Sequence, residues 1–206
     1  MHKFEEIEMA DILYRYKDNV YVNITNKCNC RCTFCIRFLK DSVGDAQALW
    51  HTTNPTKDDV IKAIDEYDFT GCSEVVFCGY GEPTCALDIL IPVAKYIKEE
   101  KKLKVRLNTN GLGSAQNERD IVPELSEVID SVSVSLNAPS KEEYEAVSRP
   151  LVEDAFDKMV DFTVKCTKVI PEVRWTVVDV LPEEELDRCR KLAEDNKINL
   201  VVRKMQ

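Results

Sequence analysis

The sequence predicts an α/β protein, a (βα)6 partial TIM barrel with a parallel sheet and outer helices. Strand-like and helix-like patterns alternate along most of the chain, which indicates parallel strands joined by helical crossovers. Six such units are fewer than the eight of a closed barrel, and no Gly-x-Gly-x-x-Gly motif precedes a helix. A chain of 206 residues is long enough for one sizeable core, so we expect residues 1–206 to form a single domain.

The individual elements follow from local patterns. Residues 1–17 are expected to be a short flexible lead or an edge element. Val20, Val22 and Ile24 alternate with polar or aromatic neighbours, which predicts the first strand over residues 19–25. The other predicted strands are residues 74–78, 104–108, 131–136, 173–178 and 199–203. The predicted helices are residues 57–67 with Thr56 as N-cap, 87–101, 121–128, 140–166 with a break at Arg149-Pro150, and 183–196.

Charge and composition narrow the function classes. The chain has a net charge of −9 and a pI of about 4.9, which disfavours nucleic acid as a partner because phosphate binding needs a basic face. No apolar run approaches the ~20 residues that a membrane span needs, and the first residues lack the apolar segment of a secretory signal. Nine cysteines, an odd number, favour a cytoplasmic protein with reduced thiols.

Four thiols follow the first predicted strand within eight residues: Cys28, Cys30, Cys32 and Cys35. Thiolates this close repel one another unless something positive holds them, and in a reducing compartment this is usually a metal. Cys28, Cys32 and Cys35 form a C-x3-C-x2-C arrangement, and three thiolates can hold three irons of a [4Fe–4S] cube and leave the fourth open. Cys30 is an extra thiol that we expect to point away. The alternative is a zinc site formed by Cys28 or Cys30 with Cys32 and Cys35, but such sites usually need a second C-x2-C pair, which the chain lacks.

Four basic residues surround these thiols: Lys27, Arg31, Arg37 and Lys40. They form either an ordinary solvated loop or a positive collar that stabilises thiolates and attracts an anionic substrate or reductant.

The cysteine loop, residues 26–37, resembles the cluster-binding loop of the radical S-adenosylmethionine (SAM) superfamily, C-x3-C-x-aromatic-C, with Phe34 as the aromatic residue. The resemblance covers about residues 19–204 and also implies a partial barrel. It implies one [4Fe–4S] cluster held by Cys28, Cys32 and Cys35, whose open iron chelates the amino and carboxylate groups of SAM. An electron from the cluster would then cleave SAM to a 5′-deoxyadenosyl radical.

Polar segments follow the predicted strands, at the edge of the sheet where ligands of parallel α/β proteins bind. Gly-Tyr-Gly-Glu-Pro-Thr, residues 79–84, resembles the superfamily's glycine-glutamate-proline motif, which implies contacts with the SAM amino group; a β-turn with an exposed glutamate is the alternative. The cofactor-binding residues that the resemblance implies are Phe34, Tyr80, Gly81, Glu82, Pro83, Asn110, Ser135, Asn137, Arg149 and Val177. Ser135 and Asn137 are expected at the ribose, Arg149 at the carboxylate and Val177 at the adenine; ordinary strand-end turns and a helix cap are the alternatives.

The resulting hypothesis is a radical SAM enzyme that acts on an unidentified small molecule or protein and receives electrons from an external donor such as flavodoxin or ferredoxin. The Asn-Ile-Thr-Asn-Lys-Cys sequence before the cluster, Leu49-Trp50 and the residue 79–84 motif look like those of the small TatD-associated radical SAM proteins. The open side of a six-strand barrel is expected to be covered by a large substrate, a partner protein or a second subunit. No catalytic residue is assigned. The alternatives are a glycyl-radical-enzyme activase, a nucleic-acid-modifying enzyme, and a non-catalytic zinc- or iron-binding accessory protein.

Overall fold

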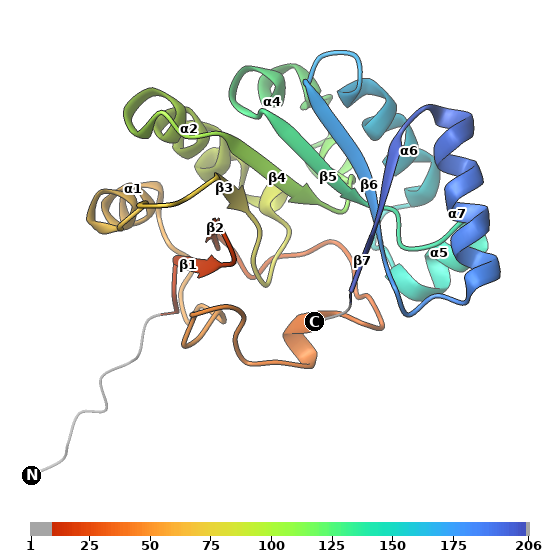
Figure 1. Ribbon diagram of the computed structural model, residues 1–206, viewed down its shortest axis with the longest axis horizontal. Helices are drawn as coiled ribbons and strands as arrows, with labels where there is room; N and C mark the ends of the chain where they lie inside the picture. The colour runs from red at the N-terminus through yellow and green to blue at the C-terminus, as the bar shows by residue number, and fades with distance from the viewer. Residues whose placement is uncertain (1–9, 205–206) are drawn as a thin grey trace, which may run out of the picture.

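The computed structural model describes residues 10–204, which form a seven-stranded sheet curved into a partial barrel (Figure 1). The strands lie in the sheet in sequence order, and all neighbours from β2 to β7 are parallel, whereas β1 is antiparallel to β2. Their bounds are β1 (Leu13–Tyr16), β2 (Asn19–Val22), β3 (Glu74–Phe77), β4 (Val105–Thr109), β5 (Ser131–Ser135), β6 (Glu172–Val178) and β7 (Asn199–Arg203). Because β1 and β7 are both edges, the sheet does not close, and the predicted six-unit partial barrel is confirmed.

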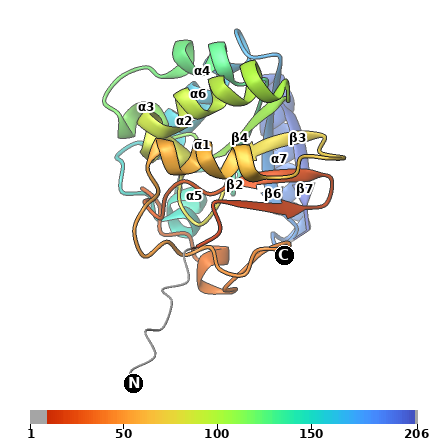
Figure 2. The same ribbon diagram turned by 90° about the vertical axis from the view of Figure 1, so that its left-hand side faces the viewer.

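The helices cover the outer, convex face of the sheet, as Figures 1 and 2 show from two directions. Their bounds are α1 (Lys57–Glu66), α2 (Leu87–Tyr96), α3 (Gly113–Gln116), α4 (Val122–Val128), α5 (Lys141–Ser148), α6 (Ala155–Cys166) and α7 (Glu183–Asn196). The described residues also form two 3-10 helices, η1 (Ile36–Phe38) and η2 (Pro83–Ala86), and a π-helical segment that continues α2, η3 (Ile97–Lys101). Within residues 10–204, no helix combines the length and apolar character that a membrane crossing requires.

The apolar core lies between the outer face of the sheet and these helices. Leu107, Val134 and Trp175 occupy this face on three strands and are completely buried. The indole Nε1–H of Trp175 donates to the Thr163 hydroxyl of α6 at 3.0 Å, so the one polar group of this large side chain is satisfied inside the core. The alternate residues of the same strands face the inside of the barrel and are mostly polar.

Two details of the sequence prediction are resolved by the structure. Thr56 caps α1 in a reciprocal capping box with Asp59, as its position before the acidic first turn predicts. Part of the expected lead is an ordered edge strand, because β1 pairs with β2 through a turn at Lys17, which has a φ of 54°. Residues 1–9 of the expected flexible lead lie outside the described residues.

Candidate functional site

The cysteine loop leaves β2 and runs across to α5, where backbone hydrogen bonds attach it. The Arg31 N–H donates to the carbonyl of Ser148 at 3.1 Å, and the Thr33 N–H donates to the carbonyl of Val147 at 2.9 Å. These two bonds join the loop that follows β2 to α5, the helix that follows β5 in the chain. Tertiary contacts therefore hold this stretch, which has no regular secondary structure between β2 and η1.

Cys30 is the anchor of the loop in the apolar core. Its side chain is 3% exposed, and its backbone forms an isolated bridge with Pro150. The Cys30 thiol also hydrogen-bonds the Cys32 sulfur; this bond, together with burial, raises the pKa of Cys30, and the same bond lowers the pKa of Cys32. Cys30 is buried, while Cys28, Cys32 and Cys35 are half-buried.

The three half-buried thiols share a cationic neighbour. Burial raises the pKa of Cys28 to about 12 and also raises that of Cys35. The Arg37 guanidinium acts in the opposite direction on Cys28, Cys32 and Cys35 alike. Among the basic residues of the predicted collar, Arg37 is thus the one placed to stabilise thiolates at all three positions.

The donor set suits an iron–sulfur cluster, whose ligands are thiolates. Within residues 10–204, no three His, Cys, Asp or Glu side chains are gathered closely enough to hold a metal ion. A [4Fe–4S] cube spreads three thiolates over three separate irons, so Cys28, Cys32 and Cys35 could hold it without sharing one ion.

The turn over residues 79–84 packs directly on the start of the cysteine loop. The Glu82 N–H donates to the carbonyl of Lys27 at 2.8 Å. A Cβ at Gly81 would lie 2.2 Å from the Thr25 carbonyl oxygen and 2.6 Å from that of Lys27, and a Cβ at Gly79 would lie 2.1 Å from the Asn23 amide oxygen. Both glycines are needed because neighbouring groups approach the turn more closely than a side chain would allow.

Glu82 is buried, and both carboxylate oxygens are engaged by the chain's own donors. Oε1 accepts from the N–H and hydroxyl of Thr84, at 3.1 and 2.7 Å, and from the Thr109 hydroxyl at 2.7 Å. Oε2 accepts from the Asn110 N–H at 2.8 Å. Burial raises the pKa of Glu82, and these hydrogen bonds oppose the rise. Its side chain fastens the ends of β3 and β4 together, an arrangement different from the exposed glutamate of a simple turn.

Asn110 and Asn137 belong to the same network of strand ends and loop. The Asn110 amide donates to the Asn29 side chain at 2.6 Å and so ties the end of β4 to the cysteine loop. Asn137 has a φ of 63°, and its amide donates to the Ser148 hydroxyl at 3.0 Å, which ties the segment after β5 to the end of α5. Sequence reasoning missed Asn29 and Ser148, since nothing in their local patterns signals these distant partners.

Tyr80, Arg149 and Val177 are also predicted to contact the cofactor, and the structure places them in three different environments. Tyr80 is buried in a small apolar cluster, and its hydroxyl donates to the Lys40 carbonyl. Arg149 ends α5 in a left-handed conformation with φ 44°, and its side chain is exposed. Val177 is 1% exposed and shares the helix-facing side of β6 with Trp175, so its side chain is unavailable to a ligand inside the barrel. This corrects the predicted adenine contact of that side chain.

Three further predicted contacts lie near the strand ends and the loop. Phe34 and Ser135 are half-buried, and Pro83 begins η2 as a buried residue.

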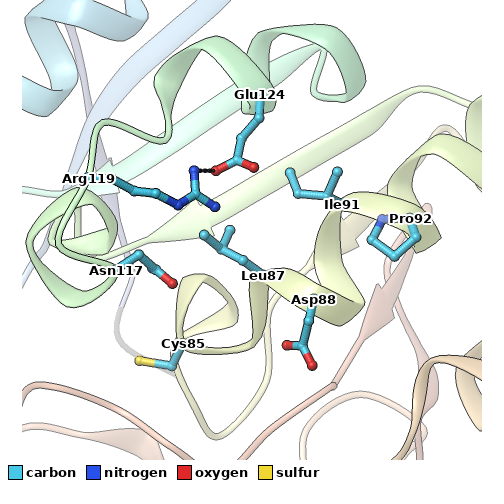
Figure 3. A pocket seen from close by; sticks show the side chains of 8 residues that line it. All are labelled: Cys85, Leu87, Asp88, Ile91, Pro92, Asn117, Arg119 and Glu124. Atoms are coloured by element: carbon cyan, nitrogen blue, oxygen red, sulfur yellow. Dashed lines mark hydrogen bonds and ion pairs between the residues drawn. The ribbon is translucent and has the colours of Figure 1, made fainter.

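A cavity of about 440 Å³ lies outside the barrel, between α2 and the α3–α4 segment (Figure 3). Leu87 and Ile91 line one wall, and the Arg119–Glu124 ion pair lines the other. Cys85 is the lining residue closest to the candidate site: burial raises its pKa to about 12, with further contributions from Glu82 and Cys28. None of the predicted cofactor-binding residues lines this cavity, so it is separate from the strand-end site.

The family follows from a match of residues 22–195 to the model of the radical SAM superfamily. The chain belongs to this superfamily. Its members are enzymes that bind a [4Fe–4S] cluster and SAM. The matched span contains all four loop cysteines and all six parallel strands except the last and the beginning of β2.

Individual relatives are similar over nearly the whole chain. A Methanocaldococcus jannaschii protein named as a glycyl-radical enzyme activating enzyme is 27% identical over 197 residues, covering 92% of this chain and 74% of that protein. A GTP 3′,8-cyclase of Clostridium perfringens is 24% identical over 196 residues, covering 93% of this chain and 56% of that enzyme. This chain therefore spans little more than half the length of the cyclase.

Solved structures share the fold. Methylornithine synthase superposes with a TM-score of 0.65 at 12% identity, covering 90% of this chain and 52% of that one. The protein anSMEcpe, solved with bound AdoMet, superposes with a TM-score of 0.62 at 18% identity, covering 90% of this chain and 50% of that one. At these identities the likeness concerns the fold alone.

Proposed function

We propose that this chain holds one [4Fe–4S] cluster through Cys28, Cys32 and Cys35 and reductively cleaves SAM to a 5′-deoxyadenosyl radical that acts on a separate substrate. The observation that carries this proposal is the position of the cysteine loop. It lies at the carboxyl ends of the parallel strands, fixed on one side by the Gly81 turn and on the other by α5. When bound, the cluster supplies the electron that cleaves SAM.

The chain's own residues would orient SAM and exclude water from it. The backbone of Gly81 can approach the SAM amino group closely because no side chain intervenes. Glu82 positions that backbone from behind through its hydrogen bonds to Thr109 and Asn110. Ser135 and Asn137, at the end of β5, are proposed to hold the ribose hydroxyls, and Arg149 is exposed and able to reach a carboxylate.

An external electron donor is proposed to approach the cysteine loop from the solvent side. Phe38, Leu39 and Trp50 are exposed there, with 68%, 54% and 52% of their surface accessible. The Arg37 guanidinium lies 4.9 Å from the Phe38 ring and 6.0 Å from the Trp50 ring. Exposed apolar side chains combined with positive charge suit a small acidic redox protein such as a flavodoxin or ferredoxin. The same open side is where a partner protein or second subunit is proposed to bind.

A glycyl-radical-enzyme activase is the second candidate. It is favoured by the M. jannaschii protein of that name, of whose length this chain covers 74%. An activase acts on a backbone glycine of a partner protein, so it would need the open side of the barrel to admit a protein loop. We propose that the chain acts as one domain in either case, because a single sheet and its helices share one large core within residues 10–204.

The test is anaerobic reconstitution with iron and sulfide, followed by addition of SAM and dithionite and measurement of 5′-deoxyadenosine. The wild-type protein should form it, and Cys32→Ala should not. Cys72→Ala is the matched control, because Cys72 is a half-buried thiol outside the loop, and it should behave as wild type. A protein that binds one zinc and no sulfide, or a cluster that never cleaves SAM, would instead support a non-catalytic accessory protein.

A further inference from the structure

Three buried hydrogen-bond donors on or beside the cysteine loop have no acceptor within residues 10–204. They are the Nδ2 amide of Asn29, the Nε of Arg37 and the hydroxyl of Tyr144. A buried N–H or O–H group is unfavourable unless an acceptor meets it, so each such group in a folded protein requires an explanation. Asn29 and Tyr144 are uncharged, so substitutions there test hydrogen bonding without changing the charge of the loop.

The amide of Asn29 has a fixed orientation. The Asn110 Oδ1 accepts from the Leu112 N–H at 3.0 Å, which turns the Asn110 Nδ2 toward the cysteine loop. This nitrogen donates to the Asn29 Oδ1 at 2.6 Å and lies 3.5 Å from the Cys30 sulfur. Because the Oδ1 of Asn29 must face that donor, its own Nδ2 faces away from Asn110 and remains a donor. Asn29 is 4% exposed and directly follows Cys28, so this donor lies inside the loop.

Tyr144 reaches the same loop from α5. It lies one helical turn before Val147 and Ser148, whose carbonyls accept hydrogen bonds from the loop. Its side chain is completely buried in the same core as Cys30. Burial raises the pKa of Tyr144 and the charges of Cys30 and Cys32 raise it further, which agrees with a hydroxyl beside these two sulfurs. The Ser148 hydroxyl also lies near, but it forms no hydrogen bond of normal geometry with Tyr144.

Ligand sulfurs are the acceptors that suit these two donors. A protonated thiol is a weak acceptor, whereas a thiolate carries the negative charge that makes a strong one. Metal binding deprotonates the cysteines that hold the metal, so Cys28 and Cys32 become strong acceptors in the cluster-bound protein. Both donor atoms are buried by the chain itself, so sulfurs of the same loop can reach them without the displacement that SAM or a substrate would require.

We infer that the Asn29 amide donates to the Cys28 thiolate and the Tyr144 hydroxyl to the Cys32 thiolate when the cluster is bound, and that both bonds raise its reduction potential. The inference rests on the proposed function and adds to it two residues that control how readily the cluster accepts an electron. Reduction adds negative charge to the cluster and its ligand sulfurs. Donors to these sulfurs therefore stabilise the reduced state more than the oxidised state, which raises the potential.

The first test is Tyr144→Phe, which removes the hydroxyl and keeps the ring. A redox titration of the anaerobically reconstituted, SAM-free protein, followed by electron paramagnetic resonance, measures the potential. We expect the equilibrium constant for reduction to fall about threefold to tenfold, which lowers the potential by about 28–59 mV. Urea unfolding of the cluster-free protein should show no loss of stability, because the hydroxyl has no partner there. The opposite pattern, lower stability with an unchanged potential, would make Tyr144 a merely structural residue and overturn the inference.

Tyr96→Phe is the matched control. The Tyr96 hydroxyl donates to Asp65 at 2.7 Å and joins α2 to α1 on the outside of the barrel. Its removal should leave the potential of the cluster unchanged. An equal shift in Tyr96→Phe and Tyr144→Phe would overturn the inference, because the effect would then not depend on a donor beside the loop.

Asn29→Ala removes the second donor and should lower the potential by a similar factor. Asn110→Ala keeps the Asn29 amide but removes the bond that orients it, so its potential should also fall. The double variant should match Asn29→Ala, since Asn110 then has no donor to orient. Asn196→Ala is the matched control, because the Asn196 amide donates to the Leu192 carbonyl within α7, and its potential should equal that of wild type. An unchanged potential in Asn29→Ala, or additive lowering in the double variant, would overturn the assignment of Asn29.

Repeating the titrations at saturating SAM separates donors to the cluster from donors to SAM. Shifts that are present without SAM support the inference, whereas shifts that appear only with SAM would assign the donors to SAM and overturn it. Tyr144→Phe retains the buried ring, so it tests the inference even if Asn29→Ala fails to bind iron.

The donors and the proposed function can fail independently. Lowered potentials in variants of a protein that never forms 5′-deoxyadenosine would refute the radical chemistry and support the donors. Wild-type potentials in Tyr144→Phe and Asn29→Ala, in a protein that cleaves SAM, would refute the donors alone. A reconstituted protein that binds no cluster would refute both.

Discussion

Replacing Gly81 with alanine tests how closely the turn over residues 79–84 supports the cysteine loop. The new Cβ would lie 2.2 Å from the Thr25 carbonyl oxygen and 2.6 Å from that of Lys27, so one of these backbone segments must move by about 1 Å. Overpacking of this kind costs about 1–3 kcal/mol, and loss of the Glu82 N–H bond to Lys27 adds about 1 kcal/mol. We therefore expect Gly81→Ala to lower the free energy of unfolding by about 2–4 kcal/mol.

Gly71→Ala is the matched control. Gly71 has a φ of +71°, but no atom lies within 4 Å of its would-be Cβ, so this variant should lose only about 1 kcal/mol from backbone strain. Urea unfolding of the cluster-free proteins measures both losses, and iron per chain after reconstitution measures the consequence for the loop. Gly81→Ala should bind less iron, and Gly71→Ala should bind as much as wild type. Equal stability of the two variants, with full iron binding by Gly81→Ala, would refute the reasoning.

Three further predictions concern the loop and its supports. Cys30→Ala should keep full iron binding and lose about 1 kcal/mol of stability, whereas Cys32→Ala should lose iron; loss of iron in both would make Cys30 a ligand. Glu82→Gln should lower the free energy of unfolding, measured in urea, by about 1–3 kcal/mol. The new NH2 group would face a donor at either position, the Asn110 N–H or the Thr109 hydroxyl, so one hydrogen bond is lost. An unchanged urea midpoint of unfolding would contradict this network. Burial lowers the pKa of His51, so the unfolded chain binds a proton more readily and stability should fall as pH drops below about 6.5. His51→Gln should reduce this loss between about pH 7.5 and about pH 5.5, and an equal loss in the variant would exclude His51 as its source.

The sequence predicts the regular elements well where local chemistry decides them. Thr56 followed by acidic residues specifies the start of α1, and Arg149-Pro150 specifies the break after α5 because proline disfavours helix in the preceding residue. The strand β1 is less clear from the sequence, since its turn to β2 places Lys17, and not the usual glycine or asparagine, at a φ of 54°.

The candidate site is predictable in its location and less so in its contacts. Strand ends and cysteine spacing indicate where the polar groups gather. The partners of Glu82 come from the end of the next strand, and those of Cys30 come from the region of Pro150, so both depend on the completed fold. Val177 shows the limit of the reasoning, because its position near a strand end does not reveal that its side chain faces the helices.

The central claim is that Cys28, Cys32 and Cys35 hold a [4Fe–4S] cluster with an iron open to SAM. Electron paramagnetic resonance of the reconstituted, dithionite-reduced protein, recorded before and after SAM addition, tests it most directly. We predict the signal of a single [4Fe–4S] cluster that changes when SAM is added, in wild type and in Cys30→Ala. A protein without such a signal, or a signal that SAM leaves unchanged, would contradict the claim.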